Sequence, residues 1–226
     1  MSDDLNAKKY YDESYFEVQK AVGIANVTEI SHIFSPHIEL KDCVLDFGCG
    51  GGFLLNALNC AEKHGFDVND EALKQVKNFG ITAHNSFETI PEGKFDIIIS
   101  NSCLEHVTNP FEVLQLLRSK LKDEGTLFFR VPHETLGYAY KEGDWNYHLF
   151  TWSPMAIGNL VNAAGYKNIT FAIEKGMRPT LYRFYRGIPF INTVAAKLYR
   201  LLRLLLEELT LKRVGMDGYA IVKANK

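Results

Sequence analysis

The sequence has few of the features that mark a secreted or membrane-spanning protein. Its four cysteines, Cys43, Cys49, Cys60 and Cys103, form no C-x-x-C pair, so neither a disulfide framework nor a zinc ribbon is indicated and we expect reduced thiols. The first residues, MSDDLNAKKYYDES, lack a basic start and an apolar signal core. No run of about eighteen apolar residues occurs. We therefore expect a cytoplasmic protein without a leader or a membrane span.

The sequence also lacks a large excess of either charge. Lys plus Arg number 25 and Asp plus Glu number 27, so the net charge of −2 argues against a surface built to hold nucleic acid. This balance hides an asymmetry, because residues 175–226 carry a net +8 and residues 1–174 carry −10. We expect the basic part to face an anionic ligand, a membrane surface or a partner, with a solvated basic helix as the alternative.

The hydrophobic content, 46% of 226 residues, suits one compact domain with a sizeable core. Helical spacing over residues 5–35, which Pro36 ends, predicts two short leading helices. Apolar strands that alternate with helices then predict an α/β fold: a single doubly wound, mostly parallel seven-stranded sheet with helices on both faces. The strands are expected at residues 44–47, 65–68, 81–84, 95–100, 126–131, 169–173 and 219–222, and the helices between them at 53–62, 71–79, 110–121 and 153–164.

No repeat or linker divides the chain, so we expect one domain over residues 1–226. Between the last two strands lie about forty-five residues, too many for a bare loop. A helix from about 191 to 212 is expected there, as part of an insertion before the last strand. The predicted parts are an N-terminal helical cap (1–40), a cofactor-binding core (41–175), a basic and leucine-rich insertion (176–213) and the last strand (214–226).

The most informative stretch is VLDFGCGGGF, residues 44–53, where a strand runs into glycines that open a helix. Such a loop brings backbone close to a ligand, because only glycine avoids a side-chain clash and adopts a positive φ freely. The dinucleotide pattern G-x-G-x-x-G fails at Phe53, and the phosphate-loop ending G-K-[ST] is absent. Asp46, two residues before the first glycine, would repel a pyrophosphate but suits a ligand with an ammonium group and a sulfonium.

This stretch resembles motif I of the class I methyltransferases that use S-adenosylmethionine (SAM). The resemblance covers about residues 40–175 and a last strand near 218–222. It implies SAM as the methyl donor and S-adenosylhomocysteine as the product. Further segments similar to the family follow in order: GFD at 65–67, NSF at 85–87, NSCLEHV at 101–107, DEGT at 123–126, and HLFTWS at 148–153 before a helix that ends AGY at 164–166.

The resemblance places the cofactor at the ends of the first strands. Asp67, nineteen residues after the first glycine of the loop, should accept hydrogen bonds from the two ribose hydroxyls, and Asn85 stands near the adenine in place of the commoner Asp. Each assignment has an alternative. The glycines could form an ordinary tight turn, and Asn85 and Ser86 a simple turn. Asp67 could be a helix N-cap, although Asn69 or Asp70 could fill that role equally well. The implied cofactor-binding residues are Asp46, Gly48, Cys49, Gly50, Gly52, Asp67, Val68, Asn85, Ser86, Phe87 and Asn101.

Histidines that follow the strands are the candidates for acid–base chemistry. SAM is already a good electrophile, so holding the nucleophile in line and excluding water supply most of the effect. A hydroxyl acceptor also benefits from a base with a pKa of about 6.5. We therefore expect His106 and His148 as catalytic residues and His133 and Tyr147 as substrate-binding residues, with packing or surface roles as the alternatives. No carboxylate cluster with metal-ligand spacing appears in this rim of the sheet, so we expect no metal.

The predicted acceptor depends on the insertion. Arg178, Arg183 and Arg186 are interleaved there with aromatic residues, and guanidinium forks commonly hold phosphate or carboxylate. We therefore expect O-methylation of a small anionic acceptor, such as a phosphorylated or nucleotide-linked sugar or a glycan precursor. The leucine-rich segment 190–212 suits a lid, a homodimer face or a peripheral membrane contact, with core packing as the alternative.

Three other functions remain open on the sequence. The first is methylation of a lipid-like or quinone-like ring, for which the leucine-rich insertion would form an apolar pocket. The second is a non-catalytic binding module with the cofactor fold, against which the intact Asp46, Asp67 and loop glycines argue. The third is methylation of nucleic acid, against which the absence of an N-P-P-[YF]-like tetrad after the fourth strand argues, since NSCL stands at residues 101–104.

Overall fold

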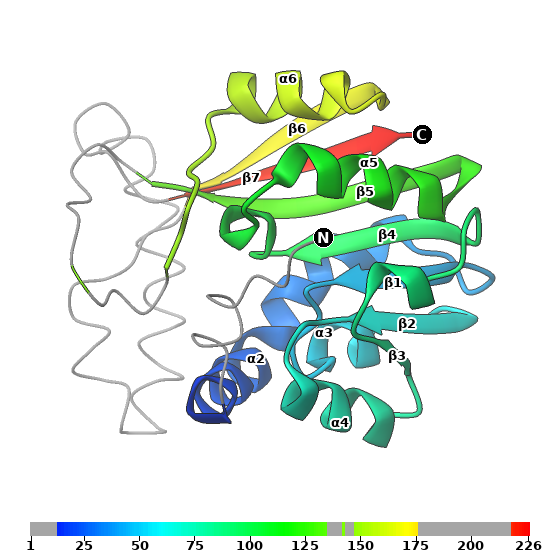
Figure 1. The fold of residues 1–226 in the computed structure, drawn as a ribbon, viewed down its shortest axis with the longest axis vertical. Coiled ribbons are helices and arrows are strands. Elements are labelled where there is room, and N and C mark those ends of the chain that lie inside the picture. Colours follow the sequence, from blue (N-terminus) through cyan, green and yellow to red (C-terminus); the bar gives the residue numbers. More distant parts are fainter. Residues whose placement is uncertain (1–12, 135–141, 143–146, 176–217) are drawn as a thin grey trace.

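The computed structural model describes residues 13–134, 142, 147–175 and 218–226 (Figure 1). In this part of the chain a seven-stranded sheet has the order β3-β2-β1-β4-β5-β7-β6. Only β7 runs antiparallel to its neighbours, β5 and β6, so the predicted mostly parallel sheet is confirmed. The strands are β1 (Cys43–Phe47), β2 (Glu62–Phe66), β3 (Thr82–His84), β4 (Phe95–Asn101), β5 (Leu121–His133), β6 (Lys167–Lys175) and β7 (Gly218–Asn225).

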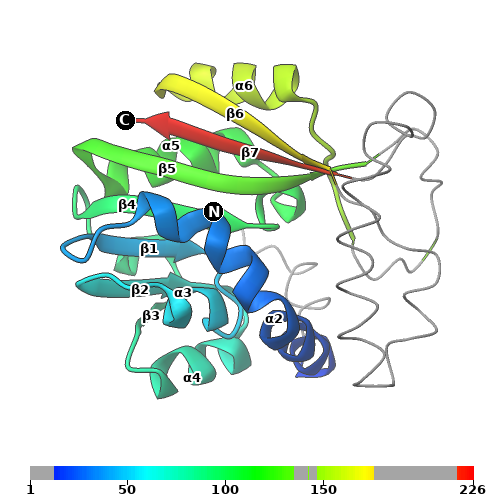
Figure 2. The ribbon, with the colours of Figure 1, turned by 180° about the vertical axis from the view of Figure 1, so that it is seen from behind.

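Helices cover both faces of the sheet, as predicted (Figures 1 and 2). One face carries α2 (Glu13–Phe34), α3 (Phe53–Ala57) and α4 (Asp70–Asn78), and the other carries α5 (Pro110–Lys120) and α6 (Pro154–Ala163). Each face has its own core of buried apolar side chains. Three short 3-10 turns are η1 (Ser35–His37), η2 (Phe87–Thr89) and η3 (Leu104–His106).

The central strands are apolar on both faces because helices cover both of them. All five residues of β1 are buried, and three consecutive isoleucines of β4, Ile97 to Ile99, divide between the two cores. Asp46 is the one charged residue of β1, and only 2% of its surface is exposed. A carboxyl in such a place requires a reason beyond packing.

The start of β2 differs from the prediction. Helix α3 ends at Ala57, five residues before the predicted end, and β2 begins at Glu62 instead of Gly65. The carbonyl of Asp42 accepts hydrogen bonds from the amides of Ala61 and Glu62, at 3.0 and 3.3 Å, and so draws these residues into the sheet. The polar side chains that open β2 lie where the sheet meets solvent and therefore hide the strand from an apolar pattern.

The predicted N-terminal helices are described only in part. Residues 13–34 form one continuous helix of 22 residues, and residues 1–12, which include the start of the predicted pair, lie outside the described part. Pro36 follows in η1, so the helix stops where the sequence predicts. The described residues contain no helix that is both long and apolar enough to cross a membrane. The predicted helix within 191–212 falls on residues that the structure does not describe.

The local signals at α6 are confirmed. The Ser153 hydroxyl accepts a hydrogen bond from the amide of Ala156 at 3.1 Å, and Pro154 occupies the first helical position. Gly165, with φ +96°, follows the helix as the predicted stop. All four cysteines are described, and all four are free thiols.

Candidate functional site

The glycine loop after β1 has the backbone that its sequence predicts. Gly48, Gly50 and Gly52 have φ of +76°, +50° and +74°, in the left-handed region that favours glycine. The amides of Gly48 and Cys49 both donate to the carbonyl of Phe66, at 2.8 and 2.9 Å, so the loop is joined to the end of β2. A side chain on Gly48 would overlap the thiol of Cys103. The loop is therefore built for close backbone approach.

Asp67, directly after β2, fastens the same loop. Its Oδ2 accepts from the Gly50 amide at 2.8 Å, and its Oδ1 accepts from the Asn69 amide at 2.9 Å. The N-cap of α4 is Asn69, which accepts from the amides of Glu71 and Ala72, so the alternative role of Asp67 as that cap is wrong. Each carboxylate oxygen keeps a lone pair that can accept from a ligand hydroxyl.

Two carboxyl groups lie close together beneath the loop. Burial, and then the charge of Asp67, raise the pKa of Asp46 to about 8. Burial also raises the pKa of Asp67, although backbone amides oppose that shift. A cationic group bound here would favour the ionised form of both carboxyls. The pair therefore fits a ligand that carries positive charge, as SAM does.

The segment expected at the adenine lies beside Asp67, whose amide donates to the carbonyl of His84 at 3.1 Å. Asn85 is exposed, and Phe87 packs on Phe47 and Phe66 with ring centroids 5.7 and 5.0 Å apart. Ser86 and Phe87 are half-buried, and Val68 is 40% exposed. The predicted cofactor residues of the first three strands thus gather at one edge of the sheet.

The end of β4 contains a strained residue and a polar network. Ser102 has φ +52°, a conformation that is uncommon outside glycine and is found most often at functional sites. The Asn101 side chain accepts from Arg130 Nη1 at 3.2 Å, and Arg130 Nε donates to Glu174 at 2.7 Å. The Arg130 guanidinium also lies over the ring of Tyr219. Sequence analysis missed Arg130, whose signal is a charge within the apolar strand β5.

The fold brings the two predicted catalytic histidines together. The rings of His106 and His148 have centroids 5.0 Å apart. His148 Nδ1 lies 2.6 Å from Glu134 Oε1, and His106 Nδ1 lies 3.3 Å from the carbonyl of Tyr147. Because carboxylate and carbonyl oxygens only accept, each Nδ1 carries the proton and Nε2 is the basic nitrogen of a neutral ring. Burial, and then His148, lower the pKa of His106 to about 4, so this ring is neutral at physiological pH.

Glu105, which sequence analysis did not single out, completes this group. Its side chain is fully buried, and burial raises its pKa to about 8. Oε1 lies 3.8 Å from His106 Nε2 and 4.0 Å from His148 Nε2, and neither carboxyl oxygen has a hydrogen-bond partner among the described residues. The ligand atoms of the three residues lie within 4.8 Å of one another, a spacing that suits a divalent cation. Sequence spacing could not reveal this group of one carboxyl and two imidazoles, because His148 lies forty-two positions after His106 in the chain.

The residues predicted to bind the methyl acceptor do not all lie in one described place. His133 is exposed at the end of β5, where its Nδ1 lies 2.9 Å from the carbonyl of Trp152. Tyr147 is 36% exposed and has φ +47°. Arg178, Arg183 and Arg186 lie outside the described residues.

The sequence matches the model of one known protein family over most of its length. A family described as a methyltransferase domain matches residues 21–170, which is more than half of the chain. The chain belongs to that family. It contains a methyltransferase domain, and the resemblance carried by the motifs is confirmed.

Relatives and solved structures agree with this assignment. The methyltransferase is 35% identical over 109 residues to the ubiquinone biosynthesis O-methyltransferase of Actinobacillus pleuropneumoniae, a match that covers 41% of this chain and 47% of the relative. The chain thus spans about half the length of such relatives. A SAM-dependent methyltransferase from Archaeoglobus fulgidus superimposes with a TM-score of 0.59 at 19% identity, over 92% of this chain and 94% of its own. The phosphoethanolamine N-methyltransferase 2 of Haemonchus contortus gives 0.58 at 17% identity, over 91% and 52%.

Proposed function

We propose that this methyltransferase transfers the methyl group of SAM to a hydroxyl on a quinone-like aromatic ring. The observation that carries the proposal is the 2.6 Å contact between His148 Nδ1 and Glu134, which fixes His148 Nε2 as a base beside a buried carboxyl. The named activity of relatives that are up to 35% identical supports a ring hydroxyl as the acceptor.

The residues of the glycine-loop edge would hold the cofactor. Asp67 would accept from the ribose hydroxyls, the segment of Asn85, Ser86 and Phe87 would border the adenine, and the buried Asp46 would favour the cationic group. The bound cofactor supplies an electrophilic methyl. The left-handed glycines supply the close backbone approach that such a ligand requires.

The proton of the acceptor hydroxyl passes to His148 Nε2. Glu134 then stabilises the imidazolium through Nδ1–H, as a carboxylate does for a catalytic histidine elsewhere. Glu105, whose pKa of about 8 keeps it protonated at neutral pH, adds no negative charge beside the oxygen as that oxygen becomes an anion. His106, also neutral, packs against the ring of His148 and orders it.

The anionic, sugar-linked acceptor remains a prediction that rests on Arg178, Arg183 and Arg186, outside the described residues. Cytoplasmic localisation and membrane or dimer contacts through residues 190–212 likewise remain predictions. No described contact favours any of them over the aromatic acceptor.

A substrate panel tests the proposal. The chain is incubated with labelled SAM and either hydroquinone-like rings, with and without a short prenyl tail, or sugar phosphates and nucleotide sugars. We expect methyl transfer to a ring hydroxyl, with kcat/KM at least tenfold above that for any sugar, identified by mass spectrometry of the product. The matched control is the same ring with its hydroxyls already methylated, which should not react. Transfer to the sugars alone would overturn the proposal.

A further inference from the structure

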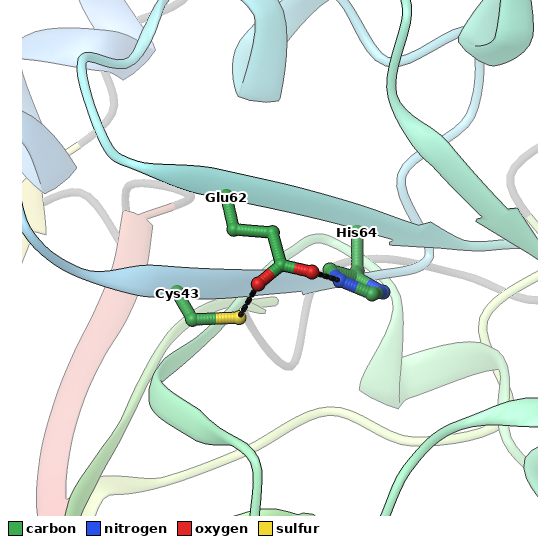
Figure 3. A group of neighbouring side chains, drawn as sticks. All are labelled: Cys43, Glu62 and His64. Carbon is green, nitrogen blue, oxygen red and sulfur yellow. Dashed lines mark hydrogen bonds and ion pairs between the residues drawn. The ribbon is translucent and has the colours of Figure 1, made fainter.

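A second cluster of reactive side chains lies at the opposite edge of the sheet from the glycine loop, where β1 and β2 begin. Cys43 and Glu62 are paired across the two parallel strands, and His64 lies two residues beyond Glu62 on the same face of β2. Figure 3 shows the three side chains turned toward one another. The Cys43 thiol lies 3.6 Å from Glu62 Oε2, and His64 Nε2 lies 2.8 Å from Glu62 Oε1. This cluster has no part in the proposed methyl transfer.

The far side of His64 is held in one orientation by a chain of hydrogen bonds. The Thr89 hydroxyl donates to the carbonyl of Ser86 at 2.8 Å, so its oxygen accepts from His84 Nδ1 at 3.1 Å. Burial lowers the pKa of His84, whose neutral ring therefore accepts at Nε2 from His64 Nδ1, 2.8 Å away. His64 thus uses Nδ1–H for this buried contact and directs Nε2 toward Glu62. A histidine that binds a metal is oriented in the same way, by a hydrogen bond from its second nitrogen.

We propose that Cys43 Sγ, the Glu62 carboxylate and His64 Nε2 bind one Zn²⁺-class ion at this edge. Zinc takes sulfur at about 2.3 Å and nitrogen or oxygen at about 2.0 to 2.2 Å, which in a tetrahedron places the ligand atoms about 3.3 to 3.6 Å apart. Sulfur lies 3.6 Å from Oε2 and Nε2 lies 2.8 Å from Oε1, and the three ligand atoms lie within 4.8 Å of one another, so the half-exposed Glu62 has to turn to present one oxygen to the ion. The sulfur, nitrogen and oxygen set suits a borderline-soft ion and not Mg²⁺ or Ca²⁺.

Binding of the ion replaces the protons on His64 Nε2 and Cys43 Sγ and displaces the ammonium group of Lys94. Lys94 now hydrogen-bonds to Glu62, and its side chain is 32% exposed, so it can turn into solvent. Glu62 Oε1 accepts from Lys94 Nζ and from His64 Nε2–H. Binding removes that proton and the Cys43 thiol proton. One divalent cation enters as two protons leave, and the net charge of the cluster is unchanged.

The exposure of the three side chains indicates where the ion enters the site. Cys43 and His64 are 7% and 3% exposed, whereas the Glu62 side chain is 47% exposed, so the ion enters beside Glu62 and water fills the fourth position. The bound ion joins β1 to β2 and so raises the melting temperature by mass action.

Cobalt spectroscopy tests the site. The metal-free, reduced chain is titrated with Co²⁺, which gives a near-ultraviolet thiolate-to-cobalt band only where a cysteine is a ligand. We expect one equivalent to produce the band and Zn²⁺ to bleach it, because zinc binds such ligands more tightly. The cluster of Glu105, His106 and His148 has no sulfur and cannot produce this band. Absence of the band in the wild-type chain overturns the proposal.

Matched variants assign the ligands. Cys43→Ser should abolish the band, whereas Cys60→Ser, at a thiol that contacts the backbone carbonyl and not the carboxylate of Glu62, should keep it. Glu62→Gln changes a half-exposed side chain and should weaken Co²⁺ binding at least tenfold, so it decides the matter should Cys43→Ser fail to fold. His148→Gln should leave the band unchanged. A band that survives Cys43→Ser, or full affinity in folded Glu62→Gln, overturns the proposal.

Discussion

Asp67 performs two tasks with one carboxylate, because it fastens Gly50 and, in the proposed function, accepts from the ribose hydroxyls. Asp67→Ala removes both, and we expect SAM affinity to fall by about 1.5 to 3 kcal/mol, the range for hydrogen bonds to a charged group. Calorimetry measures the loss. Asp70→Ala, an exposed acid in the first turn of α4, is the control and should bind normally. Unchanged SAM binding by Asp67→Ala would contradict the placement of the ribose.

The Glu134 carboxylate lies 2.6 Å from His148 Nδ1, so its effect on catalysis should pass mainly through that imidazole, although its charge also raises the pKa of Glu105. We expect His148→Ala to lower kcat about 10²- to 10⁴-fold. Glu134→Gln should lower kcat less, because the imidazolium loses its carboxylate partner while the imidazole itself remains. SAM affinity should not change in either variant. Glu124→Gln, at an exposed carboxylate of β5, provides the control, and a Glu134→Gln kcat equal to that of wild type would refute the pairing.

The glycine loop packs against the residue that caps η3, since Gly48 lies directly against Cys103. Gly48→Ala should therefore destabilise the fold more than Gly80→Ala. The two glycines have nearly the same φ, +76° and +73°, but a side chain at Gly80 meets no atom within 4 Å. Gly80→Ala measures backbone strain alone, about 1 to 2 kcal/mol. The excess for Gly48→Ala, read from urea denaturation, measures the contact, and equal losses would show that the loop can move away from η3.

Stability of the whole molecule should fall as pH rises through neutrality. The folded-state pKa of Asp46 and of Glu105 is about 8, well above the values of unfolded carboxyls, so the stability they contribute is present below about pH 4 and lost as pH rises to about 8. His106 opposes them only up to about pH 6.5, because its folded pKa is about 4. The decline should therefore be steepest from about pH 6.5 to 8, at up to about 1.4 kcal/mol per pH unit for each carboxyl.

Urea denaturation of the ligand-free protein across this pH range checks the sign. Asp46→Asn and Glu105→Gln should each flatten the curve, whereas Asp123→Asn, at a side chain that is 99% exposed, should leave it unchanged. A stability that rises from pH 6.5 to 8 would show that these carboxyls are ionised in the folded protein.

The sequence by itself determined the fold class, the glycine loop, and the positions of Asp46 and Asp67. Short stretches of sequence determine these features, because strand and helix periodicity, left-handed glycines and acids at strand ends depend on residues close together in the chain. It also specified the cap and stop of α6 through Ser153 and Gly165. The early start of β2 was missed, because a backbone contact to Asp42 and not an apolar pattern produces it.

Only the tertiary structure decided which side chains act together. Glu105 and His106 meet His148 and Glu134 because β4 and β5 end at the same edge of the sheet, and Cys43 meets Glu62 because β1 and β2 are in parallel register. Burial by the packed layers, which no local pattern records, then raises the pKa of Asp46 and Glu105 and lowers that of His106. The members of each group are far apart in the sequence, so no local pattern predicts the group, and the order of the strands in the sheet brings them together.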